Sequence, residues 1–145
     1  MTIVASPELV EWWTTPAGED LINAVSALSW TPADSLSSTA QLRRHYPDLT
    51  PEILNGTIDL VQARQRAVEK LGPASAHWFL TLAAVQQATP YAVTHYRSRR
   101  LLSSDSTIAQ PIHDATCSVG TEVAALVQAG RSGDRRGSRM EQGRV

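Results

Sequence analysis

The sequence predicts a mainly helical fold: an amino-terminal helical bundle followed by one short strand, a tight turn and a helix. Before Ser103, apolar residues recur at three- and four-residue steps, which is typical of helices, and no strand-like alternation occurs. After Ser103 this pattern changes. The 145 residues, 42% hydrophobic and 19% charged, suffice for one modest globular domain. We therefore expect a mainly α protein that ends in the beginning of an α/β arrangement.

The dipeptide Thr-Pro marks several expected helix starts. A Thr hydroxyl can accept hydrogen bonds from the free N–H groups of a first helical turn, and Pro suits the first helical position because its φ is already set. The dipeptide occurs at Thr15-Pro16, Thr31-Pro32, Thr50-Pro51 and Thr89-Pro90.

The clearest predicted helix spans about 51–71 and is followed by Gly72-Pro73, which supply a stop. Its expected inward stripe consists of Leu54, Ile58, Val61, Val68 and Leu71. A shorter helix is expected over about 16–28, with Leu21, Ile22, Val25 and Leu28 facing inward. Further helices are expected over 33–45 and 90–102, with a weaker helical segment at 80–88.

Composition excludes several classes of protein. No window approaches the roughly 20 apolar residues of a membrane helix. The first ten residues lack the features of a secretory signal, so the expected location is the cytoplasm. Cys117 is the only cysteine, which excludes internal disulfides, and the four histidines are far apart, so we expect no metal site.

Charge is distributed unevenly along the chain. Residues 131–145 contain five Arg against two acidic residues, a net +3, whereas residues 1–130 contain eight basic and twelve acidic groups, a net −4. This Arg-, Gly- and Ser-rich tail is expected to be disordered. It could contact phosphates or be a solvated end with no role. The expected organisation is a helical region over 1–102, a strand–turn–helix unit over 103–130, and the tail.

The strand–turn–helix unit contains the best candidate for a binding motif. Its expected strand leads from Ile108 to Asp114, a turn of small residues runs to Gly120, and an apolar-periodic helix follows over about 120–130. Open α/β sheets use this arrangement to bring backbone N–H groups and a helix N-terminus to a nucleotide-like ligand. Small side chains are suited to such a turn because the ligand approaches the backbone.

The segment 114–122 resembles motif I of class I S-adenosylmethionine-dependent methyltransferases. It is most similar to trimethylguanosine-synthase-like enzymes and bacterial methyltransferases with a C-terminal THUMP-like domain. Similar upstream features are Phe79-Leu80-Thr81, Gln86 to Pro90, the basic stretch 95–100, and the helix end at 64–72. The resemblance implies a Rossmann-like domain that uses S-adenosylmethionine and methylates RNA. It assigns cofactor binding to Asp114, Thr116, Cys117, Ser118 and Gly120.

Motifs that such an enzyme needs downstream are missing after residue 130. A class I methyltransferase has further strands, an acidic residue for the ribose hydroxyls and an Asn/Asp-Pro-Pro-aromatic motif, and this chain has no Pro-Pro. We therefore expect residues 1–130 to be the beginning of a longer methyltransferase and 131–145 to arise from a frameshift or early termination. The chain alone would then be inactive, and no catalytic residue is assigned.

Two alternatives remain open at this stage. Arg97, Arg99 and Arg100, near Tyr91 and Tyr96, could contact RNA or could form a solvated helix end. The tryptophans Trp12, Trp13, Trp30 and Trp78 could stack on bases, although tryptophans near helix starts are more commonly packing anchors. The second functional hypothesis is a non-catalytic helical module that binds a partner or RNA.

Overall fold

A computed structural model describes residues 6–103 and 119–129, and within these two ranges all regular elements are helical. The predicted mainly α class is confirmed, while the predicted strand before Asp114 lies outside the described residues. The elements are α1 (Pro7–Trp13), α2 (Pro16–Ser26), α3 (Ser35–His45), α4 (Pro51–Leu71), the 3-10 helix η1 (Pro73–His77), α5 (Leu82–Gln87), α6 (Tyr91–Ser103) and α7 (Thr121–Gln128).

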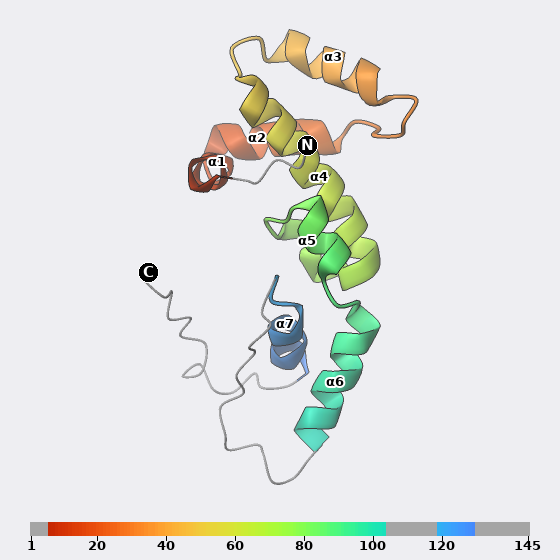
Figure 1. Ribbon diagram of the computed structural model, residues 1–145. Coiled ribbons are helices and arrows are strands. Elements are labelled where there is room, and N and C mark those ends of the chain that lie inside the picture. The colour runs from red at the N-terminus through yellow and green to blue at the C-terminus, as the bar shows by residue number, and fades with distance from the viewer. Residues whose placement is uncertain (1–5, 104–118, 130–145) are drawn as a thin grey trace. The chain divides into compact units, whose positions relative to one another are not determined.

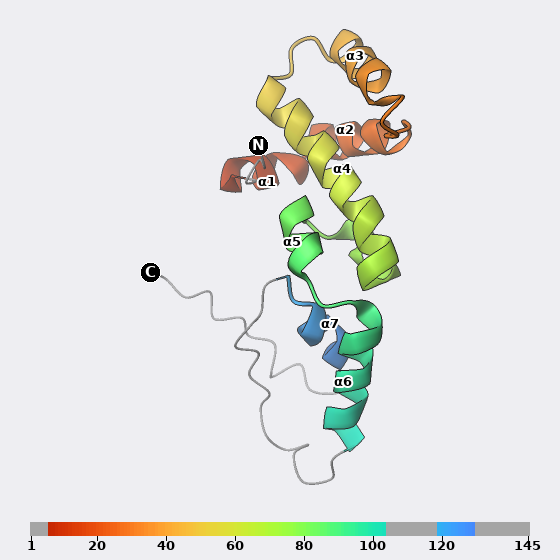
Figure 2. The same cartoon turned by 45° about the vertical axis from the view of Figure 1, so that its right-hand side comes forward.

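The chain divides into two compact units, residues 1–87 and 88–145, which are described separately. In the first unit, α4 is the central element (Figure 1). Helices α1 and α2 pack against α4 on one part of its length, and η1 and α5 pack against its C-terminal part (Figure 2). Helix α4 therefore contacts both the helices that precede it, α1 and α2, and the helices that follow it, η1 and α5.

Helix starts follow the predicted capping chemistry at two of the Thr-Pro positions. The hydroxyl of Thr15 accepts from the Gly18 N–H at 3.2 Å, and that of Thr50 accepts from the Ile53 N–H at 3.3 Å. Proline occupies the first turn in both helices. The unpredicted helix α1 uses the same device, since Ser6 accepts from the Leu9 N–H and precedes Pro7.

The other two Thr-Pro dipeptides behave differently. The Thr31 hydroxyl does accept from the N–H three residues on, that of Asp34, at 3.3 Å, but residues 32–34 form a turn and α3 begins only at Ser35. The Asp34 carboxylate accepts hydrogen bonds from the hydroxyls of Ser29 and Thr31. Helix α6 begins at Tyr91, and its first turn is closed by backbone bonds to the Pro90 carbonyl. The helix start predicted near residue 90 is thus confirmed. The helix expected after Thr31 begins four residues later, at Ser35.

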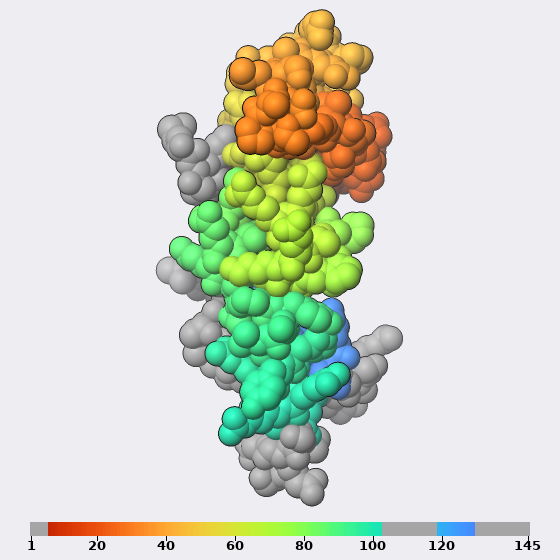
Figure 3. Space-filling model, turned by 90° about the vertical axis from the view of Figure 1, so that its right-hand side faces the viewer, coloured from red at the N-terminus to blue at the C-terminus, as the bar shows by residue number. Residues whose placement is uncertain are grey.

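The core of the first unit matches most of the predicted inward residues. Leu21, Ile22 and Val25 of α2 are buried, as are Leu54, Ile58, Val61 and Leu71 of α4, and Leu28 is half-buried. Val68 is 37% exposed, so its predicted inward position is wrong. The inward stripe of the second half of α4 instead follows Leu60, Ala63, Ala67 and Leu71. Figure 3 shows the outer side of this half of α4, which other elements do not cover on that face.

Close packing of α1 depends on two glycines. A Cβ at Gly18 of α2 would overlap the Trp12 carbonyl oxygen and lie 2.7 Å from the Trp13 Cα. A Cβ at Gly56 of α4 would lie 2.6 Å from the Leu9 Cδ2. Helix α1 therefore approaches α2 backbone to backbone, whereas it approaches α4 through a side chain.

The second unit contains α6 and α7, which pack against each other. Within its described part, the buried residues are all small: Ala88, Thr94, Ser98 and Ala125. Larger apolar side chains remain exposed, including Tyr96 (65%) and Val127 (55%). The described part of this unit therefore buries little apolar surface.

Candidate functional site

The predicted cofactor motif is only partly covered by the structure. Asp114, Thr116, Cys117 and Ser118 lie outside the described residues, as does the tail 131–145. Gly120 and the helix that follows it are described. The predicted helix over about 120–130 is present as α7, Thr121–Gln128.

Gly120 occupies the N-cap position of α7 in the left-handed conformation, with φ 74° and ψ 20°. This backbone geometry favours glycine because side chains with a Cβ are strained there. An ideal Cβ at Gly120 would meet no atom of residues 6–103 or 119–129 within 4 Å. The turn therefore requires glycine for its conformation and not for lack of space beside these residues. Glu122, in the first turn of α7, lies where the helix dipole favours a carboxylate.

The three arginines of α6 do not have equal surroundings. Arg97 Nη1 donates to Glu122 Oε1 of α7 at 2.7 Å, with the two side chains 58% and 22% exposed. Arg99 and Arg100 are exposed. The described residues of this helix contain no acidic side chain. The ion pair joins the basic helix to the helix that begins at Gly120, and such exposed pairs contribute at most about 1 kcal/mol.

Tyr91 and His95 form a second polar contact on α6. The phenol of Tyr91 is hydrogen bonded to His95 Nε2, and the two rings meet edge to face with centroids 4.2 Å apart. The other imidazole nitrogen, Nδ1, is buried and has no hydrogen-bond partner among the residues that the structure describes. The contact fixes the first turn of α6, which follows Thr89-Pro90.

Arg64 and Lys70, which lie in the segment 64–72 of the family resemblance, both donate hydrogen bonds to the backbone of the chain that follows α4. Arg64 donates from Nε to the Trp78 carbonyl (2.9 Å) and from Nη2 to the His77 carbonyl (3.2 Å). Lys70 Nζ donates to the Val85 and Gln86 carbonyls at 2.9 and 2.6 Å, at the end of α5. Cations are favourable at a helix C-terminus. These two side chains therefore fix the path of residues 77–87 along α4.

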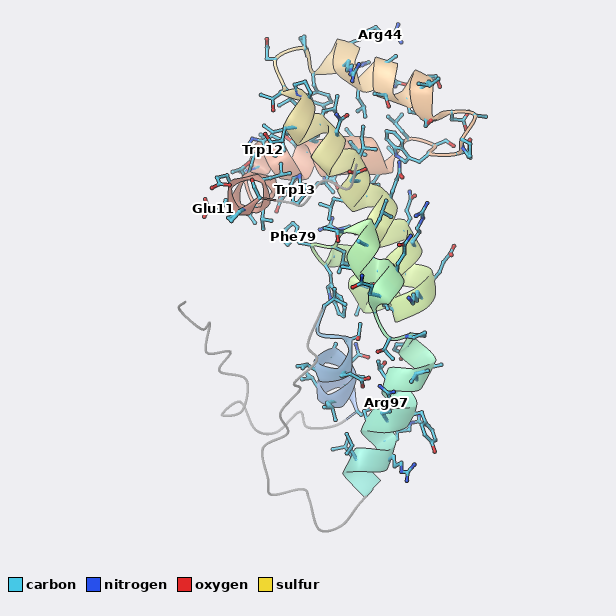
Figure 4. The ribbon with its side chains drawn as sticks, in the orientation of Figure 1. Glu11, Trp12, Trp13, Arg44, Phe79 and Arg97 are labelled. Carbon is cyan, nitrogen blue, oxygen red and sulfur yellow. The ribbon has the colours of Figure 1, made fainter. Side chains whose placement is uncertain are left out.

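The first unit also contains a pocket of about 370 Å³ that sequence reasoning missed. Its lining comes from α1 (Trp13, Thr14), α2 (Glu19, Ile22, Asn23), α4 (Arg64) and the segment that follows α4 (His77, Phe79). Figure 4 shows Phe79 beside the end of α1 that carries Trp13. The two rings are parallel within 4°, with centroids 5.9 Å apart.

Aromatic and charged groups meet in this pocket. The Arg64 guanidinium carbon lies 5.4 Å from the centroid of the Phe79 ring, a cation–π arrangement. Burial lowers the pKa of the Arg64 guanidinium, although arginine remains a cation at any physiological pH. Glu19 lines the same pocket, and no ion pair joins it to Arg64 within the described residues. The pocket thus presents a cation and an anion that do not neutralise each other.

Trp13 is an anchor of the core as well as a pocket wall. Only 3% of its surface is exposed, and its indole N–H donates to the Thr57 hydroxyl at 2.8 Å. Trp30 donates to the Val25 carbonyl at 2.9 Å. The interpretation of these two tryptophans as packing anchors is confirmed.

The described residues contain no cluster of three or more His, Cys, Asp or Glu side chains that could hold a metal ion. In the same part of the chain, no helix is both long and apolar enough to cross a bilayer.

Part of this chain is similar to known proteins. A family profile described as Domain of unknown function (DUF8688) matches residues 6–67, which contain α1 to α3 and most of α4. Two uncharacterised S-adenosylmethionine-dependent methyltransferases of Mycobacterium tuberculosis, from strains CDC 1551 and H37Rv, are each 38% identical to it over 90 residues. That alignment covers 59% of this chain and 22% of each relative. No solved structure matches the chain.

The chain therefore corresponds to about a fifth of the length of these relatives. The described residues contain two separate candidate features: the pocket in the first unit, and the Gly120 turn with the N-terminus of α7 in the second unit.

Proposed function

We propose that this chain forms the amino-terminal part of an S-adenosylmethionine-dependent methyltransferase that acts on RNA. The observation that carries the methyltransferase part of the proposal is the 38% identity, over 90 residues, to relatives named as S-adenosylmethionine-dependent methyltransferases. The RNA substrate rests on the family resemblance of residues 79–127. The glycine turn at Gly120 and the helix that follows it are compatible with the first cofactor-binding turn of such an enzyme. The proposed group is the trimethylguanosine-synthase-like and THUMP-like one, on the resemblance of residues 79–127.

The residues proposed to hold S-adenosylmethionine are Asp114, Thr116, Cys117, Ser118 and Gly120. When bound, this cofactor supplies the methyl group on its sulfonium. Gly120 fits the role because it adopts the left-handed backbone conformation at the N-cap of α7, and no atom of the described part of the chain lies within 4 Å of the position of a Cβ. Asp114 would order the turn and meet the cofactor.

The proposed RNA contact is α6, which presents Arg97, Arg99 and Arg100. Guanidinium groups suit phosphates, and Tyr96, which is 65% exposed, can stack on a base. Arg97 is paired with Glu122. Among the three arginines, Arg99 is the main proposed contact. We propose that the enzyme works in the cytoplasm and that methyl transfer needs protein segments other than these 145 residues.

The test is thermal unfolding of the chain with and without S-adenosylmethionine, backed by calorimetric titration. A ligand at 100 times its Kd stabilises the folded state by about 2.7 kcal/mol, so binding should raise the Tm. Gly120→Val should abolish the shift, because it strains the turn and fills the open space. A chain that shows no shift with millimolar S-adenosylmethionine contradicts the proposed cofactor site.

The second candidate function is a helical module that binds RNA or a protein without catalysis. The exposed apolar and basic side chains of α6 favour it. A stable RNA complex or dimer without any effect of S-adenosylmethionine would support this function instead. Reading the gene beyond the codon for Gly130 in three frames would separate the two, since the first function requires a ribose-binding acid and an Asn/Asp-Pro-Pro-aromatic motif there.

A further inference from the structure

The pocket of the first unit contains an aromatic ring that the fold leaves partly uncovered. Phe79 is 45% exposed, and it is the only exposed aromatic residue among the described residues of this unit. Its ring is held parallel to Trp13 and beneath the Arg64 guanidinium. Since Trp13 is itself fixed by its bond to Thr57, the plane of Phe79 is set before any ligand arrives. The exposed part of this ring could contact a planar ligand at little entropic cost.

The polar groups around this ring can recognise the edge of a planar ligand. Glu19 and Asn23 are four residues apart on α2, so they lie on the same helix face, and both line the pocket. A carboxylate accepts N–H donors, and an amide can both donate and accept. Neither side chain has a hydrogen bond within the described residues. This pair therefore suits a base that carries an amino group, because Glu accepts from such groups.

The same pocket provides a cation for an anionic group. Arg64 donates from Nε to the Trp78 carbonyl and from Nη2 to the His77 carbonyl, which leaves both N–H groups of Nη1 and the second N–H of Nη2 as further donors. The His77 side chain is exposed at the pocket rim. Arg64 is anchored at two points, so its third nitrogen is presented in a fixed direction. Phosphates and carboxylates are the anions that a guanidinium binds best. A phosphate is therefore a suitable partner for Arg64.

We propose that the pocket binds a nucleotide: its base stacks on Phe79, Glu19 and Asn23 bind the amino edge, and Arg64 binds the phosphate. The volume of about 370 Å³ is within the range of small-ligand pockets. The nucleotide is either part of a single-stranded RNA or a free mononucleotide. The RNA source rests on the proposed function, whereas nucleotide binding does not.

The experiment measures calorimetric binding of AMP, GMP, CMP and UMP to the whole chain, and fluorescence anisotropy with a labelled single-stranded heptanucleotide RNA. Mononucleotides with an amino-bearing base should bind more tightly than UMP. If the RNA is the source, the oligonucleotide should bind at least tenfold more tightly than its best mononucleotide. If mononucleotides bind as tightly, the pocket takes a free nucleotide.

Matched variants connect binding to the pocket. Phe79→Leu should weaken binding about tenfold or more, as expected for the loss of base stacking, and Phe79→Tyr should retain it. Glu19→Gln should weaken the binding of nucleotides whose base carries an amino group, and it should reduce the preference of the pocket for these nucleotides over UMP. Glu69→Gln, an exposed change on α4 outside the pocket, and Leu36→Ala, on α3, are the controls. The Tm of each variant shows that it is folded.

The proposal is overturned if neither mononucleotides nor RNA bind, or if they bind equally well to Phe79→Leu and Glu19→Gln. Its failure can be distinguished from failure of the proposed function. Loss of nucleotide binding with an intact S-adenosylmethionine shift rejects the pocket alone, and nucleotide binding without that shift rejects the cofactor site alone.

Discussion

Trp13 and Thr57 are joined by a buried hydrogen bond, 2.8 Å from the indole Nε1 to the hydroxyl oxygen, across 44 residues of sequence. The Thr57 hydroxyl donates in turn to the Ile53 carbonyl of its own helix, at 2.8 Å. The two side chains thereby fix α1 on α4. Since Trp13 also stacks on Phe79, this bond orders one wall of the pocket.

Replacing Thr57 by Val should destabilise the protein by about 1–3 kcal/mol, because the shape is kept but the buried indole N–H loses its acceptor. Urea unfolding measures this loss. Thr39→Val is the control: its hydroxyl donates only to the Ser35 carbonyl of its own helix, so the expected change is within about 0.5 kcal/mol. Equal effects of the two changes would contradict a special role for the Trp13–Thr57 bond.

The two packing glycines should respond differently to alanine. Gly18→Ala places a Cβ against the backbone of α1, 2.7 Å from the Trp13 Cα, so α1 must move. We expect a loss of about 3 kcal/mol or more, at the upper end of overpacking effects. Gly56→Ala meets the end of the Leu9 side chain, which can turn away, and should cost about 1 kcal/mol.

Chemical denaturation of the two variants tests this order. Near-UV circular dichroism should also change more for Gly18→Ala, since the ring of Trp13 moves with α1. If Gly56→Ala is the more damaging change, the assignment of the backbone contact to α2 is wrong.

The sequence predicted much of the helical framework because its signals are local. Thr50 and Gly72 bound α4, and both act through groups within a few residues of themselves. Ser6-Pro7 carries the same signal as Thr15-Pro16, and extending the capping rule from Thr to Ser would have found α1. Val68 was placed inward because its spacing fits a stripe, but only tertiary packing decides that Ala67 faces the core instead.

The candidate pocket could not be predicted in this way. Its walls come from α1, α2, α4 and the segment after η1, and no local spacing relates Glu19 to Phe79. The family resemblance included Arg64 and Phe79, which both line the pocket. It did not relate them to each other, and the hydrogen-bond partners of Arg64 are the backbone carbonyls of His77 and Trp78. The proposed cofactor motif differs from the pocket because its residues are adjacent in sequence. It could therefore be predicted from the family resemblance without any knowledge of tertiary contacts.

Ionisation of two carboxyl groups, Asp59 and Asp34, should have opposite effects on the stability of the fold. Burial raises the pKa of Asp59 above its ordinary value, so its ionised form opposes folding. The associated stability is fully present below the pKa of the unfolded chain and is lost as pH rises through the raised pKa. Asp59→Asn should therefore raise the Tm at pH 7, and this gain should disappear in acid, near pH 3.

Asp34 provides the opposite case. Hydrogen bonds from the Thr31 and Ser29 hydroxyls lower the pKa of its carboxyl. Its contribution is present above the ordinary pKa of Asp and is lost as pH falls through the lowered value. Asp34→Asn should thus lower the Tm at pH 7, with the gap closing in acid. Thermal unfolding from pH 2.5 to 7.5 measures both, and gaps of the same sign would contradict the assignment.

Pairing of Arg97 with Glu122 should limit RNA binding by α6 if the proposed RNA contact is correct. Glu122→Gln releases the guanidinium that now donates to Oε1 at 2.7 Å. One more phosphate contact to a single strand steepens the dependence of log K on log salt by about 0.7. Arg99→Ala should reduce that slope by a similar amount and weaken binding to all sequences alike.

Fluorescence anisotropy of a labelled single-stranded RNA at several salt concentrations measures these slopes. Arg43→Ala, which removes an exposed cation at the end of α3, is the matched control and should leave the slope unchanged. If Arg43→Ala and Arg99→Ala reduce the slope equally, binding is a diffuse effect of positive charge. If Glu122→Gln leaves the slope unchanged while Arg99→Ala lowers it, Arg97 contacts no phosphate, and the RNA path on α6 passes over Arg99.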